Sequence, residues 1–183
     1  MIPNRTLLIP IDFSNASKVA VKFALSNEYK KGDKLILLHC YRLIDDDYFS
    51  YRNTPLKLKK LIEQKLQRKF NSFSKSLSLD QYYPDVEFGM KMGFIANCIH
   101  TFYNECPTDL IIFGLKKNKS SHTLIQLISE NQVPVMLIEE NLNLEKYIPD
   151  ETKTLNPTDF SSQPNRYLKE VHTHPDTPYL VLT

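Results

Sequence analysis

Polar and basic residues that could hold a ligand follow three apolar runs of the sequence. Asp12 follows the run TLLIPI, Cys40 lies near the end of the run KLILLHCY, and residues 116–121 (KKNKSS) follow Gly114. Three lysines and two hydroxyls at the start of a helix can hold a phosphate or another anion by charge. A solvated lysine-rich turn is the favoured alternative, since loops are commonly polar. Asp12 can orient a ligand or simply stabilise its own turn, and both interpretations stay open.

Short apolar runs alternate with longer amphipathic segments along the first 140 residues. This alternation predicts right-handed crossovers, a parallel sheet and helices on both of its faces. Ligands of such sheets bind at the carboxyl ends of the strands, where the strand order reverses. The candidate site therefore lies at residues 10–14, at Cys40 and after Gly114. We expect strands at residues 6–11, 34–41, 85–90, 109–114 and 133–138, and helices at residues 16–30, 58–77, 94–105 and 121–130, with Ser14 or Asn15 capping the first helix.

Taken in order, several short motifs resemble the universal stress protein family. They are LLIPIDFSNAS, KLILLHCY, Gly93-Phe94-Ile95 at a helix start, PTDLIIFG and VPVMLIEE, and they span residues 4–140. The resemblance implies a Rossmann-like three-layer α/β/α domain with a five-stranded parallel sheet. It also implies a homodimer formed through the edge of the last strand, residues 133–138.

Many members of that family bind ATP through Gly, two residues, Gly, nine residues, and Gly-Ser or Gly-Thr after the fourth strand. Such glycines let backbone N–H groups approach the phosphates. Here Gly114 matches the first glycine, Lys117 stands at the second, and Ser121 and His122 stand at the final pair. The segment is six residues short, and side chains there would crowd the phosphates. We therefore expect no conventional ATP binding.

If a nucleotide such as ATP or AMP binds nevertheless, the resemblance implies which residues contact it. Pro10, Asp12, Cys40 and Gly114 would contact the base and ribose, and Ser121 and His122 would be remnants of the phosphate site. Lys117 would then contribute charge in place of glycine. The alternative function is accordingly an adenine nucleotide-binding stress protein with weak ATPase activity.

Other polar groups give little sign of catalysis or of a metal site. Residues 45–47 (DDD) do not converge on one ion without further ligands, and His172 and His174 lack further donors. His39 lies in an apolar strand and is interpreted as a hydrogen-bonded core histidine. None of the nucleophile, zinc or phosphate-loop motifs GxSxG, HExxH and GxxxxGK[ST] occurs, and the three cysteines show no CxxC spacing. We expect no enzyme, no bound metal and no cofactor.

Seven basic residues and one acidic residue, Glu63, lie between Leu56 and Leu79. The basic stripe could meet nucleic acid or an acidic partner. A well-formed apolar face and the lack of an aromatic stacking ladder favour a solvated outer face, so we expect no nucleic-acid partner. An adaptor that recruits a protein through this helix and the tail is a further alternative.

The composition divides the chain into a stress protein-like domain at residues 1–140 and an extension at residues 141–183. The extension is rich in Asn, Thr, Pro, Asp and Ser, yet PTDFS at residues 157–161 repeats the PIDFS pattern at residues 10–14. A remnant of a second repeat and a chance similarity in a disordered tail are both open. Residues 179–182 (YLVL) can add a strand or pack on a partner.

Net charge and hydropathy favour a cytoplasmic protein. The chain carries a net charge of +2, and its first apolar run is too short for a signal peptide or a membrane span. We expect no membrane contact. The leading interpretation is a non-catalytic, dimeric binding or regulatory module of the stress response.

Overall fold

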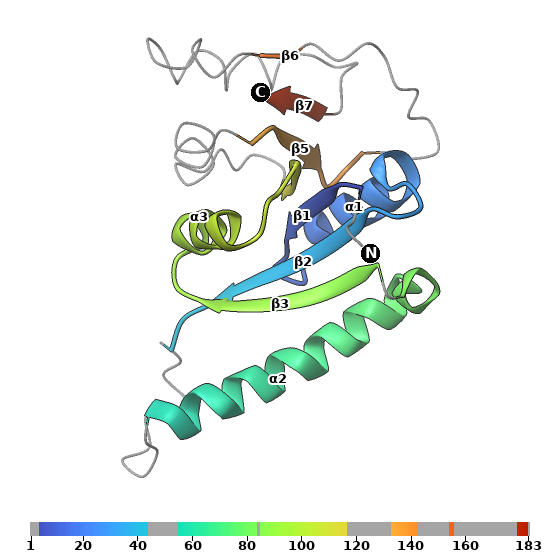
Figure 1. The fold of residues 1–183 in the computed structure, drawn as a ribbon. Coiled ribbons are helices and arrows are strands. Elements are labelled where there is room, and N and C mark those ends of the chain that lie inside the picture. Colours follow the sequence, from blue (N-terminus) through green and yellow to red (C-terminus); the bar gives the residue numbers. More distant parts are fainter. Residues whose placement is uncertain are drawn as a thin grey trace.

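The computed structural model describes residues 4–43, 55–83, 85–116, 133–142, 154–155 and 179–182. Within these ranges the expected alternation of strands and helices is confirmed (Figure 1). The boundaries move by only a few residues at most ends. The elements are β1 (Thr6–Pro10), α1 (Asn15–Phe23), β2 (Lys34–Tyr41), α2 (Pro55–Ser76), β3 (Val86–Met92), α3 (Ile95–Glu105), β4 (Leu110–Leu115), β5 (Val135–Glu139), β6 (Thr154–Leu155) and β7 (Tyr179–Leu182).

A single sheet runs through the molecule in the order β3-β2-β1-β4-β5-β7-β6. Its first five strands are parallel, which confirms the predicted five-stranded parallel sheet. β7 adds an antiparallel strand to the outer edge of β5, with Ile138 opposite Tyr179. The backbone edge that the resemblance assigns to a dimer is therefore paired within the chain.

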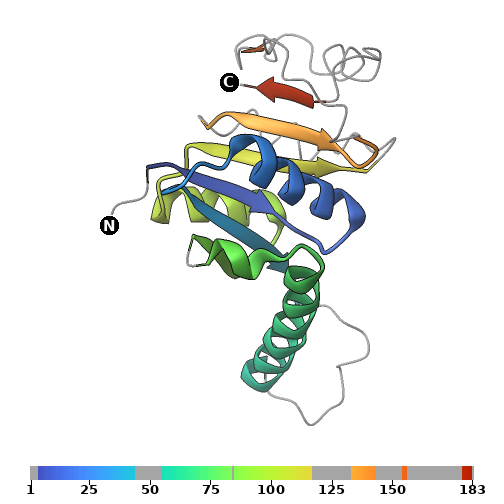
Figure 2. The same ribbon diagram turned by 90° about the vertical axis from the view of Figure 1, so that its right-hand side faces the viewer.

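Alternate residues of each strand face opposite sides of the sheet, as the strand period requires. Leu7 and Ile9 of β1 pack with α1 and the end of α2, whereas Leu8 packs with α3. All three side chains are fully buried, so both faces of β1 lie in the hydrophobic core. Figure 2 shows the strands of the sheet one above another, with α1 in front of them.

Helix α1 begins where the sequence predicts and ends earlier. Ser14 is its N-cap, and the Ser14 side chain accepts a hydrogen bond from the Ser17 backbone N–H. Beyond Phe23 the helix widens into a π-helical turn at Ala24–Glu28, instead of continuing as an α-helix to the predicted end at Lys30.

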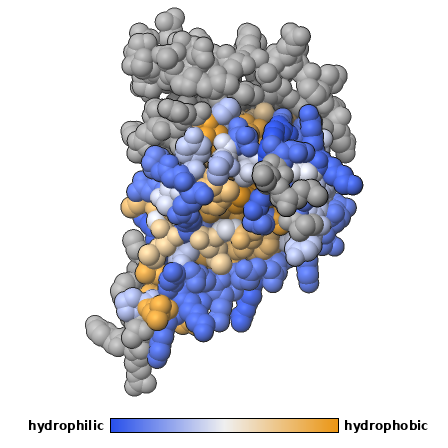
Figure 3. All heavy atoms as spheres, in the orientation of Figure 1, coloured by the Kyte–Doolittle hydropathy of each residue, from blue (hydrophilic) through white to orange (hydrophobic). Residues whose placement is uncertain are grey.

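Helix α2 lies along the β3 edge of the sheet and extends beyond it (Figures 1 and 2). Its buried residues Leu58, Ile62, Leu66 and Phe73 keep helical spacing and form one apolar face. Hydrophilic side chains project from α2 along the lower margin of the molecule in Figure 3.

Strand β1 is the middle one of the five parallel strands and joins the strands on its two sides. On one side it pairs with β2, and on the other it pairs with β4, where Leu7 lies opposite Leu110. Asp109 fixes this junction, because its Oδ2 accepts the Thr6 N–H at 2.7 Å and its own N–H donates to the Thr6 carbonyl. This hydrogen bond links residues 103 positions apart.

Several predictions fall on residues outside the described ranges. They concern the helix at residues 121–130, the acidic residues 45–47, the histidines at 172 and 174, and the repeat at residues 157–161. Within the described part of the chain, no helix has the length and apolar character needed to cross a bilayer.

Candidate functional site

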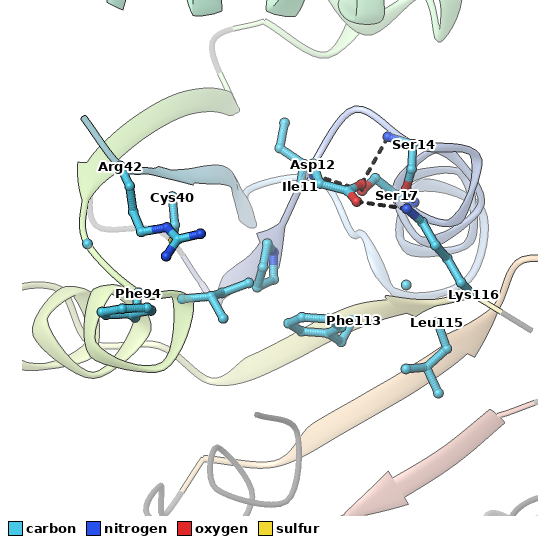
Figure 4. Close-up of a pocket in the computed structure, with 14 residues that line it drawn as sticks. Ile11, Asp12, Ser14, Ser17, Cys40, Arg42, Phe94, Phe113, Leu115 and Lys116 are labelled. Atoms are coloured by element: carbon cyan, nitrogen blue, oxygen red, sulfur yellow. Dashed lines mark hydrogen bonds and ion pairs between the residues drawn. The ribbon is translucent and has the colours of Figure 1, made fainter. Parts of the chain in front are cut away.

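A cavity of about 440 Å³ opens at the carboxyl ends of β1, β2 and β4. The strand order reverses at β1, so this is the switch point where parallel sheets place their ligands. Its volume falls within the usual range for small-molecule sites, about 300–1,000 Å³. The lining consists of Pro10, Ile11, Asp12, Ser14, Ser17, Cys40, Arg42, Gly93, Phe94, Ile95, Phe113, Gly114, Leu115 and Lys116 (Figure 4).

At one end of the cavity, Asp12 organises the turn between β1 and α1. Its Oδ1 accepts hydrogen bonds from the Ser14 N–H at 2.9 Å and from the Ser17 hydroxyl at 2.7 Å. The Ser17 Oγ in turn accepts the Asp12 N–H at 3.0 Å. Phe13, inside this turn, has a φ of 63°, a left-handed conformation that is costly for a bulky residue. The Asp12 hydrogen bonds hold the turn in that shape.

These contacts also fix the charge of Asp12. Partial burial alone would raise its pKa, but the hydrogen bonds from Ser14 and Ser17 outweigh it, and together with the nearby Lys116 ammonium they lower the pKa to about 2. The Asp12 Oδ2 lies 3.4 Å from the Lys116 Nζ. Asp12 is therefore a carboxylate at neutral pH. One of its oxygens serves the turn, and the other faces Lys116 beside the cavity (Figure 4).

Arg42 and Phe94 form the other end of the cavity. The Arg42 guanidinium carbon lies 5.1 Å from the centre of the Phe94 ring, within range of a cation–π contact. Pairing of Tyr41 with Met92 brings these residues together, since each follows its strand by one or two positions. Neither residue was predicted as part of the site. Between the two ends, the side chains of Phe113 and Leu115 line the cavity (Figure 4).

Cys40 lines the cavity as a neutral thiol. Burial raises the pKa of Cys40 well above its usual range, and the neighbouring Cys98 thiol raises it further. Thiol nucleophiles react as thiolates, so this cysteine is held in an unreactive form. All three cysteines are free, and of these only Cys98 is fully buried.

Gly114 has a packing role that its match to the glycine motif did not indicate. A β-carbon at this position would lie 2.3 Å from the Ala16 carbonyl oxygen and 2.6 Å from its carbon. The glycine therefore lets the first turn of α1 approach β4, which closes the floor of the cavity. This requirement exists whether or not a phosphate binds nearby.

The structure brings four of the predicted site residues together around one cavity. Pro10, Asp12, Cys40 and Gly114 all line it. The predicted residues Lys117, Ser121 and His122 lie outside the described residues. His39 lies elsewhere, with its Nδ1 at 2.7 Å from the Ile11 carbonyl and its ring stacked on Phe13 at 4.7 Å. Its hydrogen-bonded state agrees with the prediction, although the side chain is only partly buried.

Position and packing account for the residues that the sequence interpretation missed. Ser17 has a signal in sequence, because a hydroxyl three residues after an N-cap can reach back to the turn. Arg42 has none, because its approach to Phe94 depends on the register between β2 and β3. Among the described residues, no three His, Cys, Asp or Glu side chains are grouped so as to hold a metal ion.

Comparison with known proteins agrees with this architecture. The model of the universal stress protein family matches residues 3–137. A search of curated protein sequences found no significant match.

Solved structures of universal stress proteins share the fold at low sequence identity. One from Burkholderia pseudomallei is 15% identical, with a TM-score of 0.53 and coverage of 73% of this chain and 94% of that chain. One from Arabidopsis thaliana, solved with AMP bound, is 15% identical, with a TM-score of 0.52 and coverage of 80% and 97%. One from Archaeoglobus fulgidus is 15% identical, with a TM-score of 0.51 and coverage of 74% and 93%. At such identities these similarities show the fold alone. Together with the family match over most of its length, they lead to one conclusion: this chain belongs to the universal stress protein family.

Proposed function

We propose that this protein is a non-catalytic binding module whose cavity at the ends of β1, β2 and β4 holds a small anionic ligand. The arrangement of charge carries the proposal. Arg42 lies at one end of the cavity, Lys116 with its Asp12 ion-pair partner lies at the other, and Phe113 and Leu115 line the space between them (Figure 4). A ligand with a flat apolar part and one anionic group fits this distribution.

The ionisable groups of the described lining are suited to binding rather than to proton transfer. Asp12 has a pKa of about 2, which makes it a poor general base at neutral pH. Burial raises the pKa of Cys40, which keeps that thiol protonated. The Ser17 hydroxyl donates its hydrogen bond to the Asp12 carboxylate, whose low pKa makes it a weak acceptor of the Ser17 proton.

A nucleoside monophosphate is the ligand class that fits best, and we propose that ATP is not bound in the family's usual way. The related protein from Arabidopsis thaliana was solved with AMP, which supports an adenine ligand in a cavity of this fold. The sequence after Gly114 is short and poor in glycine, so it offers few backbone N–H groups for a β- and γ-phosphate. The cations at the cavity can hold a single phosphate by charge.

Calorimetric titration of the full chain with AMP and with ATP tests this proposal. We expect AMP to bind and ATP to bind no more tightly. Lys116→Ala or Arg42→Ala should weaken AMP at least about tenfold, or about 1.4 kcal/mol. Lys75→Ala removes an exposed charge from α2 outside the cavity lining and serves as the control. ATP binding ten times tighter than AMP binding, and weakened by Lys116→Ala, would place ATP in this cavity and contradict the proposal.

The second candidate function is weak ATP hydrolysis, with phosphates held by the segment that begins at Lys116. The position of Lys116 on the cavity lining favours it. Phosphate release from ATP distinguishes the two functions, since turnover that Lys117→Ala abolishes would establish this candidate. Phosphate release no faster than in buffer alone would favour the non-catalytic binding module.

Self-association through the outer edge of β5 is part of the proposal and carries a condition. β7 pairs with that edge from Val135 to Ile138. A second copy that adds to the sheet must first displace β7, or must exchange its own β7 for it. The oligomeric state should therefore respond to loss of residues 179–183.

A further inference from the structure

A second cavity, of about 450 Å³, lies between the start of α1 and the middle of α2. It shares no lining residue with the first cavity. Four basic side chains line it: Lys18 from α1 and Lys65, Arg68 and Lys69 from α2. The basic stripe of α2 is thus not wholly a solvated outer face, since part of it borders a hollow.

The convergence of these cations follows from helical spacing. Residues 68 and 69 follow residue 65 by three and four positions, so the side chains of both lie next to Lys65 on one side of α2. Like charges at this spacing destabilise a helix. Lys18 adds a fourth positive charge from the opposite element. An anion in the cavity would relieve the repulsion among these charges.

Three of the four cations, Lys18, Arg68 and Lys69, face no carboxylate among the described residues. No acidic side chain lines the cavity, and α1 contains no acidic residue. Glu63, the acidic residue of α2, accepts a hydrogen bond from the Tyr41 hydroxyl at 2.7 Å and lies 3.9 Å from the Lys59 Nζ. Within the described part of the chain, the charged groups of Lys18, Arg68 and Lys69 have no ion-pair partner.

Aromatic rings and a hydroxyl complete the lining. Phe13 and Phe73 are in edge contact, with ring centres 5.6 Å apart, and Ser72 adds an exposed hydroxyl. The Phe13 ring also stacks on the His39 ring. Burial lowers the pKa of His39, and the positive charge of Lys69 lowers it further. The positive charge of Lys69 therefore acts on the His39 imidazole as well.

We propose that this second cavity binds a small polyanion, a compact molecule that carries two or more phosphate groups. Lys18, Arg68 and Lys69 border a hollow that Lys65 also lines, and their three charges match several negative charges on one small molecule. The aromatic rings can contact an apolar part of the same ligand. A nucleic acid would instead contact cations spread along a path, whereas the cations of this cavity come from two helices and border one hollow.

Titration of the full chain with inorganic tripolyphosphate tests the inference. The variant Arg68→Gln/Lys69→Gln removes two charges from the cavity, and the control Lys60→Gln/Lys75→Gln removes two from the same helix outside it. We expect the first variant to weaken binding at least about tenfold and the control to change it less than about twofold. Matching far-ultraviolet spectra and unfolding temperatures would show that both variants fold.

The inference would be overturned if tripolyphosphate did not bind, or if both double variants lost affinity for it equally. Tighter binding of a single-stranded oligonucleotide than of tripolyphosphate would also overturn it. So would loss of tripolyphosphate binding in Lys116→Ala with no loss in Arg68→Gln/Lys69→Gln, because that result would place the anion in the first cavity. AMP titration separates the two proposals, because Arg68→Gln/Lys69→Gln should leave AMP affinity unchanged. If AMP fails to bind while tripolyphosphate binds as expected, only the proposed function falls.

Discussion

Replacement of Gly114 by alanine tests whether this glycine is required for packing rather than for a phosphate. The added β-carbon would lie 2.3 Å from the Ala16 oxygen, 2.6 Å from the Ala16 carbon and 3.0 Å from the Ser17 nitrogen. All three atoms are backbone atoms in the first turn of α1. They cannot rotate away as the end of a flexible side chain can, so α1 must move relative to β4.

The distance to the Ala16 oxygen is about 1 Å shorter than an ordinary carbon–oxygen contact, and relief of that overlap requires a shift of similar size. Overpacking of a tight core typically lowers the free energy of unfolding by about 1–3 kcal/mol. Because the obstacle here is rigid backbone, we expect a loss of about 3 kcal/mol for Gly114→Ala. For a chain of this length the unfolding temperature should fall by about 6–12 °C. Thermal unfolding followed by circular dichroism, without any ligand, measures the change.

Gly89→Ala is the matched control. Its added β-carbon would meet the Leu38 Cδ1 at 3.4 Å, an ordinary contact with a side-chain end. We expect its unfolding temperature to change by less than about 3 °C, because the cost stays below about 1 kcal/mol. An unfolding temperature for Gly114→Ala within about 1 °C of the wild type would refute the packing argument.

Three further predictions follow from the charges and from the sheet edge. The folded-state pKa of Asp12 is about 2, below its ordinary 3.8. Its contribution to stability should therefore be complete above about pH 4 and lost as pH falls through 2. In urea unfolding, the free energy of unfolding of Asp12→Asn should change less than that of the wild type between these pH values. The hydrogen bond to Asp85 raises the pKa of Tyr29 from 10.0 to about 12, so its contribution should be complete below pH 10 and lost as pH rises through 12; an identical alkaline profile in Tyr29→Phe would contradict this assignment. Deletion of residues 179–183 should uncover the edge of β5 and raise the mass measured by light scattering, whereas an unchanged mass would argue against that edge as a contact between copies.

The sheet was predictable because its strands are buried on both faces. The apolar run KLILLHCY predicted β2 with both of its ends, and Ser14 marked the start of α1 through the chemistry of its cap. The end of α1 was not predictable, since the π-helical turn after Phe23 depends on how that segment packs.

The candidate site was predictable only where topology alone decides position. Asp12 follows β1, Cys40 lies near the end of β2, and these strands pair side by side, so their shared cavity was expected. Arg42 and Phe94 meet through strand register, and Lys18 and Arg68 line one cavity from two helices, neither of which periodicity reveals. Gly114 was assigned to a phosphate motif, whereas its packing role needs the measured approach of α1.

The pairing of β1 with β4, the seam of the sheet, has a consequence for the rates of folding and unfolding. β1 reaches β2 across a short stretch of chain, with Thr6 opposite Lys34, but the Thr6–Asp109 hydrogen bond closes a loop of 103 positions. Long loops close late because more chain entropy must be lost before their contacts form. The first cavity straddles this seam, so a folding intermediate with only β1, β2 and β3 assembled would have half of it. A ligand bound there would act on the last stage of folding and would slow unfolding at the point where the two halves of the sheet part.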